Sequence, residues 1–369
     1  MAGRGKRQWA KAAVCAAALV TPLTVSGCAS QGGTGNPLGL AGTSSATKGG
    51  DSSATGGDTA GGTTAPVAES SASSSASSAS GTRNGTGGTK LTVSDGSSKI
   101  LMNGKAVDFG TAVYDQSWSP DGKKVAFIDD HDNLWVANAD GSGKVEAAKN
   151  STGEKWTHPA WQVAKADTQD GVPARNNIFF ASTAGDGTLW KVVATAHDGK
   201  PEKLELAGTA GENEVDPPQT RNMWPSAAGD FGGAIYEHDN GSSSDIWVRD
   251  DFLRQQGDLA FKNGSEPSYA IVGGSANSDP TPEVVFVRTV NGHRHIFFSV
   301  LYTANGDAPK AKDLTPNAAG DYVTPALSPD GKTVAYSTES GVYLISTDGS
   351  GTPKQITDKP GFPAFRAGS

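Results

Sequence analysis

The sequence predicts an all-β fold, a six-bladed β-propeller that is closed by strands from both ends of the folded region. Three observations carry this prediction. A strand unit flanked by turns recurs along residues 90–369, its apolar runs have the length of strands, and two incomplete units lie at the two ends of this region. Recurrence of a whole supersecondary unit outweighs local propensity, and intervals of roughly 40–45 residues are typical of four-stranded blades.

The two clearest copies of the unit share the pentapeptide SPDGK, at residues 119–123 and 328–332. Pro presets the backbone φ of a turn, Asp bonds to nearby backbone, and Gly accepts a conformation that other residues resist. In both copies an apolar run follows, then a polar turn, another strand and the sequence Asp-Gly-Ser-Gly. Each copy therefore predicts antiparallel strands joined by tight turns.

Each unit begins with a short extended segment that usually reads Pro, then Ala or Ser, then an apolar or aromatic residue. The segments are 116–118 (which lacks the Pro), 159–161, 225–227, 267–269, 325–327 and 363–365. Second and third strands follow in all units but the last. The fourth strands are less apolar, as expected at the outer edge of a blade. The longer intervals require loop insertions, and a seventh blade would fit only if residues 162–224 hold one.

The sixth unit is divided between the two ends of the folded region. Residues 363–365 form a first strand with no room for three more, whereas residues 91–93, 100–102 and 106–108 form three strands that lack a first. Pairing the two parts closes the ring and removes the exposed edges that an open stack would present. No helix is needed in this scheme.

The SPDGK turns and the strands after them resemble the WD40-like β-propeller repeat of TolB-type bacterial proteins. Residues 118–127 and 327–336 carry the resemblance best. The second, fourth and sixth units follow it in outline, and the third departs from it, with residues 228–233 in place of the turn. The resemblance implies a propeller in the cell envelope. The same repeat occurs in prolyl oligopeptidase-like peptidases. Their hydrolase domain carries a Gly-x-Ser-x-Gly elbow before a helix, and no such motif is found in this sequence.

Residues 1–27 are expected to be a lipoprotein signal peptide. Basic residues precede an apolar run over residues 12–25, which is too short to span a bilayer comfortably as a helix. The run leads into Val-Ser-Gly and Cys28, which resembles the lipobox of bacterial lipoproteins. That resemblance implies acylation of Cys28, for example by palmitate, and an extracytoplasmic protein anchored to the cell membrane. The alternative is an ordinary signal peptide with a chance cysteine.

Residues 28–89 are expected to be a disordered tether, because they consist almost entirely of Ser, Gly, Thr and Ala. Such a segment cannot bury enough apolar area to offset its ordering entropy. Residues 90–369 would then form the TolB-like propeller. The net charge of −8 becomes more negative when the basic signal is removed, which argues against a nucleic-acid partner.

The repeat register places one residue at the entry to each innermost strand. In propellers these strands border a central channel, so the entry residues would surround one mouth of it. The predicted ligand-binding residues at this mouth are Asp115, His158, Trp224, Glu266, Thr324 and Phe362, together with Arg221 from the insertion before Trp224. The predicted function is binding of a protein, peptide or envelope component at this mouth or on the insertion loops.

Catalytic and metal sites have weaker support. His293 and His295 would face one side of a strand, and they or His158 would suit a metal-dependent propeller lyase or hydrolase, but no third ligand is identifiable. The acidic run at residues 129–133 fits calcium less well than a solvated hairpin turn. Five tryptophans recur in register with the repeat and are predicted to pack between blades. The sequence thus predicts a binding protein and not an enzyme, with no cofactor and no metal.

Overall fold

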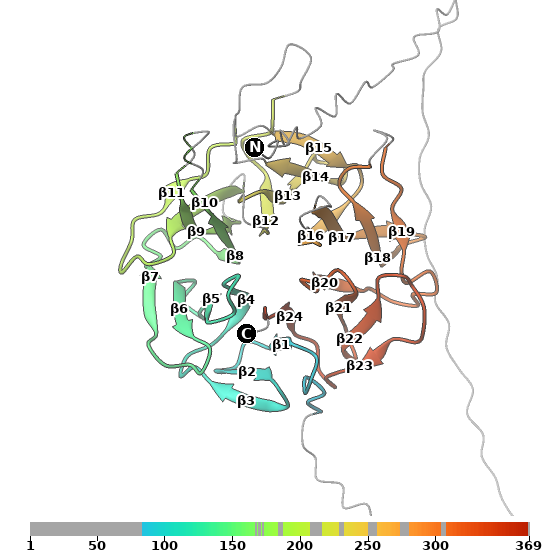
Figure 1. Cartoon of the computed structure of the whole chain (residues 1–369), viewed down its shortest axis with the longest axis horizontal. Helices are drawn as coiled ribbons and strands as arrows, with labels where there is room; N and C mark the ends of the chain where they lie inside the picture. Colours follow the sequence, from blue (N-terminus) through green and yellow to red (C-terminus); the bar gives the residue numbers. More distant parts are fainter. Residues whose placement is uncertain are drawn as a thin grey trace, which may run out of the picture. The chain divides into compact units, whose positions relative to one another are not determined.

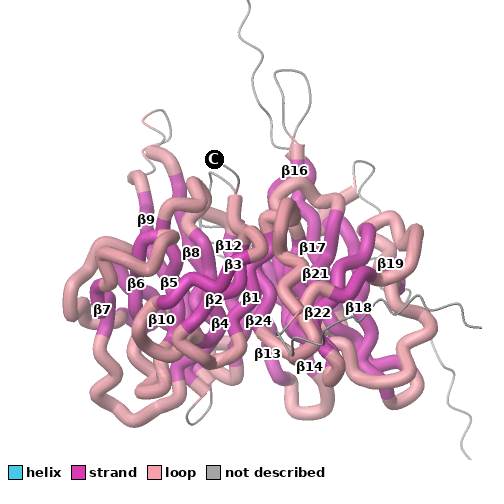
Figure 2. Tube along the Cα trace, turned by 90° about the horizontal axis from the view of Figure 1, so that it is seen from below, coloured by secondary structure: helices cyan, strands magenta, loops and turns pink. Residues whose placement is uncertain are grey.

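The computed structural model describes residues 83–166, 168, 171, 173–183, 187–206, 216–228, 232–249, 257–273, 280–303 and 308–367. Six four-stranded antiparallel sheets surround a central opening as blades (Figure 1). The predicted six-bladed propeller is therefore confirmed. The described residues form strands, turns and loops (Figure 2), and no helix able to cross a membrane is found among them.

Five blades are each built from consecutive strands, starting at the channel. Their strands are β4 (Tyr114–Trp118), β5 (Lys124–Ile128), β6 (Leu134–Asn138) and β7 (Val145–Ala148) in the first; β8 (Trp156–Ala164), β9 (Arg175–Ser182), β10 (Thr188–Val193) and β11 (Glu202–Lys203) in the second; β12 (Asn222–Ala227), β13 (Ala234–Asp239), β14 (Ser244–Arg249) and β15 (Gly257–Phe261) in the third; β16 (Ser265–Val272), β17 (Thr281–Val290), β18 (His293–Val300) and β19 (Lys312–Asp313) in the fourth; and β20 (Val323–Leu327), β21 (Thr333–Thr338), β22 (Gly341–Ser346) and β23 (Lys354–Gln355) in the fifth.

The sixth blade joins the two ends of the folded region, as predicted. Its innermost strand is β24 (Phe362–Phe365), followed outward by β1 (Leu91–Ser94), β2 (Lys99–Met102) and β3 (Lys105–Asp108). Strands β24 and β1 are antiparallel, with Phe365 opposite Leu91. The Thr92 hydroxyl also donates to the Ala364 carbonyl, at 2.8 Å. This pairing closes the ring without leaving β1 exposed at an edge.

Side chains also tie the first blade to the sixth. Gln116 stands where the other innermost strands have Pro, and its amide donates to the Phe362 carbonyl at 2.8 Å. Its side-chain oxygen accepts from the Ser94 hydroxyl. The Trp118 indole donates to the Thr92 hydroxyl at 2.9 Å. The missing Pro of the first repeat is thus explained, because a glutamine here bonds across the seam where the ring closes.

The core consists of six apolar clusters, and each lies between two neighbouring blades. Strand β5 shows how the sequence produces this arrangement. Val125 and Phe127 pack toward the sixth blade, whereas Ala126 and Ile128 pack toward the second. Alternate residues of a strand point to opposite faces, so a strand buried on both faces reads as a continuous apolar run. Such runs identified the second strands in the sequence.

The five recurring tryptophans join these clusters, but they occupy two positions of the repeat. Trp118 and Trp161 lie on innermost strands, and Trp135, Trp190 and Trp247 lie on third strands. Strand β15, the outer strand of the third blade, had no recognisable pattern in the sequence.

The folded unit begins before residue 90, so the predicted tether ends too late. The Gly85 amide donates to the Ile356 carbonyl at 2.9 Å, and Thr86 is fully buried. The Thr86 hydroxyl in turn accepts from the Gly104 amide at 3.0 Å. Residues 83–89 therefore pack on the fifth and sixth blades, although their composition resembles that of a linker. The predicted signal peptide, Cys28 and residues 28–82 lie outside the described residues.

Candidate functional site at the channel mouth

A cavity of about 320 Å³ runs along the innermost strands of all six blades. Of the residues predicted at its mouth, five line it: Asp115, His158, Trp224, Thr324 and Phe362. Glu266 lies at the equivalent position of β16 but is buried beside the cavity, and Arg221 is not among the lining residues. The six residues Asp115, His158, Trp224, Glu266, Thr324 and Phe362 are called the mouth ring below.

Five members of the mouth ring share one unusual backbone conformation. Their φ values are +50° to +53°, in the left-handed region, for the residues Asp115, His158, Trp224, Glu266 and Thr324. Each sits at a register shift between the first and second strands of its blade. Left-handed φ is uncommon for residues other than Gly, and the residue before Pro is normally extended. Four of the five precede Pro, so the repeat holds a strained conformation at this level.

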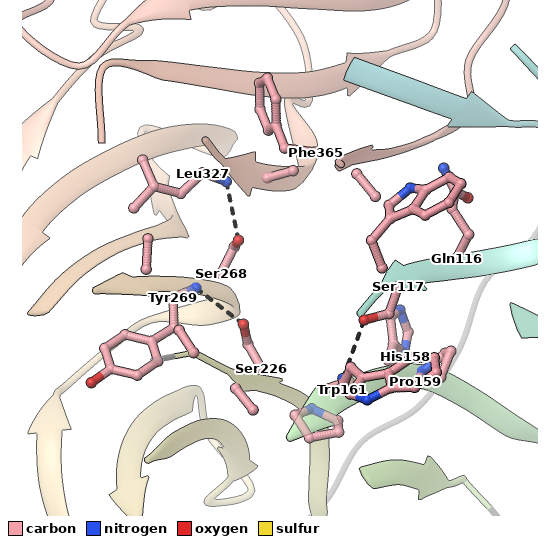
Figure 3. Close-up of a pocket in the computed structure, with 18 of the residues that line it drawn as sticks. Gln116, Ser117, His158, Pro159, Trp161, Ser226, Ser268, Tyr269, Leu327 and Phe365 are labelled. Atoms are coloured by element: carbon pink, nitrogen blue, oxygen red, sulfur yellow. Dashed lines mark hydrogen bonds between the residues drawn. The ribbon is translucent and has the colours of Figure 1, made fainter. Parts of the chain in front are cut away.

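The next level of the channel is lined by one small residue from each blade: Ser117, Ala160, Ser226, Ser268, Ala326 and Ala364. Three of these residues, all serines, also join neighbouring blades (Figure 3). The hydroxyl oxygens of Ser117, Ser226 and Ser268 accept from the backbone amides of Trp161, Tyr269 and Leu327, at 3.2, 3.0 and 3.1 Å. The Ala-or-Ser position of the repeat therefore keeps the channel open and, where it is Ser, bonds the next blade.

Asp115, His158 and Trp224 form a cluster across the first three blades. The Asp115 Oδ2 accepts from the His158 backbone amide at 3.2 Å, and the His158 Nε2 lies 3.8 Å from the same oxygen. The His158 ring stacks on Trp224 with centroids 3.5 Å apart. Burial lowers the pKa of the His158 imidazole, although the Asp115 carboxylate opposes this effect. The imidazole is therefore neutral at neutral pH.

Glu266 has the opposite environment. Its carboxylate accepts from the Thr324 backbone amide at 2.5 Å and forms an ion pair with Arg294. The Glu266 amide donates to Glu237, another buried carboxyl, at 2.8 Å. Burial raises the pKa of the Glu237 carboxyl, while the bond from Ser244 and the charge of Arg294 lower it. Glu266 thus joins the fourth blade to the fifth, and its oxygens are occupied by protein donors.

Three buried polar atoms of the mouth ring have no hydrogen-bond partner within the described structure: Asp115 Oδ1, His158 Nδ1 and Thr324 Oγ1. Such atoms cost free energy unless water or a ligand satisfies them. All three belong to residues that line the cavity. The mouth therefore has unused hydrogen-bonding capacity on the first, second and fifth blades.

Two further groups of predicted residues lie elsewhere. The Arg221 guanidinium pairs with Asp239 at 2.8 Å beside the β13–β14 turn, which explains its absence from the cavity. His293 is exposed, while His295 is buried with its Nδ1 2.8 Å from Asp313. The two histidines thus differ in environment, although they share one face of β18.

The acidic turn after β5 holds one group of three metal-ligand types within the described residues, Asp129, Asp130 and His131. The Asp129 carboxylate already accepts bonds from the His131 and Asn133 amides and the Trp135 indole, at 2.9, 2.8 and 2.7 Å. These bonds shape a hairpin turn, which is the interpretation that the sequence favoured.

Comparison with known proteins adds the fold and little more. No protein-family model matches the chain, and no curated protein matches it in sequence. Among solved structures, a chain of a nidogen/laminin complex is similar, with a TM-score of 0.50, 12% identity, and coverage of 78% of this chain and 100% of that chain. The chain is also similar to a protein assigned as TolB from Agrobacterium tumefaciens, with a TM-score of 0.47, 15% identity, and coverage of 76% and 91%.

A gluconolactonase from Xanthomonas campestris is similar with a TM-score of 0.41, 11% identity, and coverage of 68% of this chain and 76% of that chain. The similar structures thus include enzymes and non-enzymes. One fold hosts many functions, so the function of this chain has to be argued from its own site.

The sequence did not reveal three residues that shape the mouth. Arg294 and Glu237 come from second and third strands and reach the mouth ring only through folding. Tyr114 lies beside Phe362, with ring centroids 6.3 Å apart. The Tyr114 ring needs the left-handed Gly96, where any Cβ would lie 2.5 Å from the ring. Tyr114 immediately precedes Asp115, so register could have identified it.

Proposed function

We propose that this chain is a lipid-anchored extracytoplasmic binding protein, and that its propeller binds a protein or peptide partner at the channel mouth. One observation carries the binding role. Five blades hold the mouth ring in the same strained backbone conformation, yet the side chains there are Asp, His, Trp, Glu and Thr. Strain of roughly 1–3 kcal/mol per residue persists only where the surroundings enforce it, and it clusters at functional sites.

The contrast with the rest of the repeat supports this interpretation. Positions that pack between blades hold mostly apolar residues. Positions in the small-residue level hold only Ala or Ser. The mouth ring alone combines a constant backbone with varied chemistry, as expected of a surface that recognises a ligand. A cavity of about 320 Å³ suits a side chain or a short terminal segment of a partner.

Membrane attachment is proposed from the sequence around Cys28. The test is a Cys28→Ser change in the full chain, followed by separation of membranes from the soluble extract. The wild type should stay with membranes and withstand high salt, whereas the variant should be released. Equal retention of both proteins would rule out anchoring through Cys28.

The binding role can be tested by photo-crosslinking in intact cells. A photoreactive phenylalanine analogue at Phe362 reports on the mouth, and the same analogue at Lys203 on the exposed outer strand β11 is the matched control. A partner should be captured from position 362 and not from position 203. Capture from the outer position alone would move the binding surface away from the mouth.

A further inference from the structure

The charge inside the channel points to the chemical class of the ligand. Asp115 is the one acidic side chain among the residues that line the cavity, and no Lys or Arg is among them. The side chain is 9% exposed. Within the described residues the Asp115 Oδ1 has no hydrogen-bond partner, and Oδ2 accepts from the His158 backbone amide at 3.2 Å. His158 beside it is neutral at neutral pH, because burial lowers its pKa.

A buried carboxylate without a compensating cation is costly, so a positively charged ligand group would be favoured there. Three lining rings of the mouth ring, those of Phe362, His158 and Trp224, strengthen this preference. Phe362 lies on the neighbouring sixth blade, and His158 stacks on Trp224 on the second and third. Cations bind well against aromatic faces, and indole is the best of them.

The level below the mouth limits the shape of the ligand. Small side chains from all six blades line the channel there, and its serine hydroxyls are already bonded to the next blade. This level leaves room for a slim chain but offers no charge. The charged group of a ligand is therefore expected to stay at the mouth beside Asp115, with its alkyl stem against the rings of Trp224 and Phe362.

We propose, as a refinement of the proposed function on which it rests, that the channel mouth binds a primary ammonium group on an alkyl stem, with the ammonium on the Asp115 carboxylate. A lysine side chain of a partner protein and a free small amine carry this same chemistry. The unpartnered Thr324 hydroxyl lies in the same ring and adds an acceptor to the mouth. Ammonium has three donors, which matches a site rich in acceptors.

The direct test is calorimetric titration of the purified protein with n-pentylammonium. The neutral isostere 1-pentanol and the oppositely charged pentanoate are titrated in parallel. We expect measurable binding of pentylammonium, at least tenfold weaker binding of pentanol, and none of pentanoate. Equal binding of pentanol and pentylammonium would overturn the proposal, and this comparison requires no variant.

The role of Asp115 is tested by Asp115→Asn, which keeps an oxygen for the His158 amide. We expect at least a tenfold loss of pentylammonium affinity. The matched control is Asp130→Asn, which removes a charge from an exposed turn of the same blade, outside the cavity lining. Unchanged affinity in Asp115→Asn, or an equal loss in both variants, would remove Asp115 from the site. If Asp115→Asn does not fold, the titrations of the wild-type protein with pentylammonium, pentanol and pentanoate test the proposal.

A peptide arm distinguishes the two sources of the ammonium group. An N-acetylated peptide with one lysine is compared with the same peptide carrying Nε-acetyl-lysine. Tighter binding of the lysine peptide than of pentylammonium indicates a protein partner, and binding of pentylammonium alone indicates a small amine. If neither binds while crosslinking at Phe362 still captures a partner, the ammonium proposal fails and the proposed binding role stands.

Discussion

Two carboxylates of the mouth ring occupy the same position of the repeat and share its left-handed backbone, but they differ in their side-chain partners. Glu266 is bonded to the Thr324 amide and paired with Arg294. Asp115 faces the cavity, and one of its oxygens has no partner. Both carboxylates accept the backbone amide of the mouth residue on the next blade, but only the longer Glu266 side chain also pairs with Arg294. Position in a repeat therefore does not determine role, because one methylene separates a structural contact from a candidate binding group.

The largest effect that would separate the two carboxylates is on stability. We expect Glu266→Gln to lower the free energy of unfolding by about 2 kcal/mol, since it leaves Arg294 without its buried partner. The exposed third of the Arg294 side chain keeps the loss below that of a fully buried pair. Denaturant unfolding gives the value, and adding Arg294→Met should recover part of it. No loss in Glu266→Gln would mean that the contact is not stabilising.

The bonds between blades at the small-residue level should have an intermediate effect. Ser268→Ala removes the acceptor of the Leu327 amide, and we expect a loss of about 1 kcal/mol in unfolding free energy. Ser242→Ala is the control, because this exposed hydroxyl bonds only within its own turn. If both variants lose the same amount, the blade-to-blade bond contributes nothing of its own.

The pH dependence of stability should reveal the buried imidazole beside Asp115. The unfolded chain protonates His158 near its ordinary pKa of 6.5, but burial lowers this pKa in the folded state. Between these values the unfolded state binds more protons, so stability falls as pH decreases through about 6.5. His158→Asn should remove part of this fall, of the order of 1 kcal/mol, in unfolding measured from pH 7.5 to 5.5. Asn tolerates the left-handed backbone at this position. Parallel pH curves for the two proteins would show that His158 does not titrate differently on folding.

The smallest stability effect is expected at Asp115. Asp115→Asn keeps an acceptor for the His158 amide and removes a buried charge that has no compensating cation, so the free energy of unfolding should not fall by more than about 0.5 kcal/mol. The same denaturant series that tests Glu266 measures it. A loss as large as that of Glu266→Gln would make Asp115 another structural contact and erase the contrast between the two carboxylates.

The sequence predicted the architecture well because each repeat is recognisable from short sequence patterns of turns and strands. The SPDGK turns, the apolar second strands and the Pro-Ala-or-Ser segments identified strands within five blades, and the lone strand at 363–365 required the strands at 91–108. Strand β15 was not predicted, because an outer strand does not need an apolar pattern. Residues 83–89 were assigned to the tether because burial of Thr86 depends on neighbours from the fifth and sixth blades, which composition does not show.

The mouth was predicted in part. Register alone brought Asp115, His158, Trp224, Thr324 and Phe362 to one cavity, although ligand binding by them stays a prediction. Which carboxylate is occupied depends on Arg294, whose contact with Glu266 is formed only in the folded protein. The position of Arg221 depends on its pairing with Asp239 across a turn. The position of a residue in the repeat predicts where its backbone lies in the propeller. Its side-chain partners depend on the tertiary structure.

The seam of the ring has a consequence for how this molecule is made. Thr92 bonds to Ala364 across 272 positions of sequence, so the first strands of the propeller to be synthesised must wait for its last strand, β24. Contacts this distant are slow to form, and an unfinished chain presents β1 with one side unpaired. Each nascent copy is therefore exposed to mispairing with its neighbours until β24 has been synthesised.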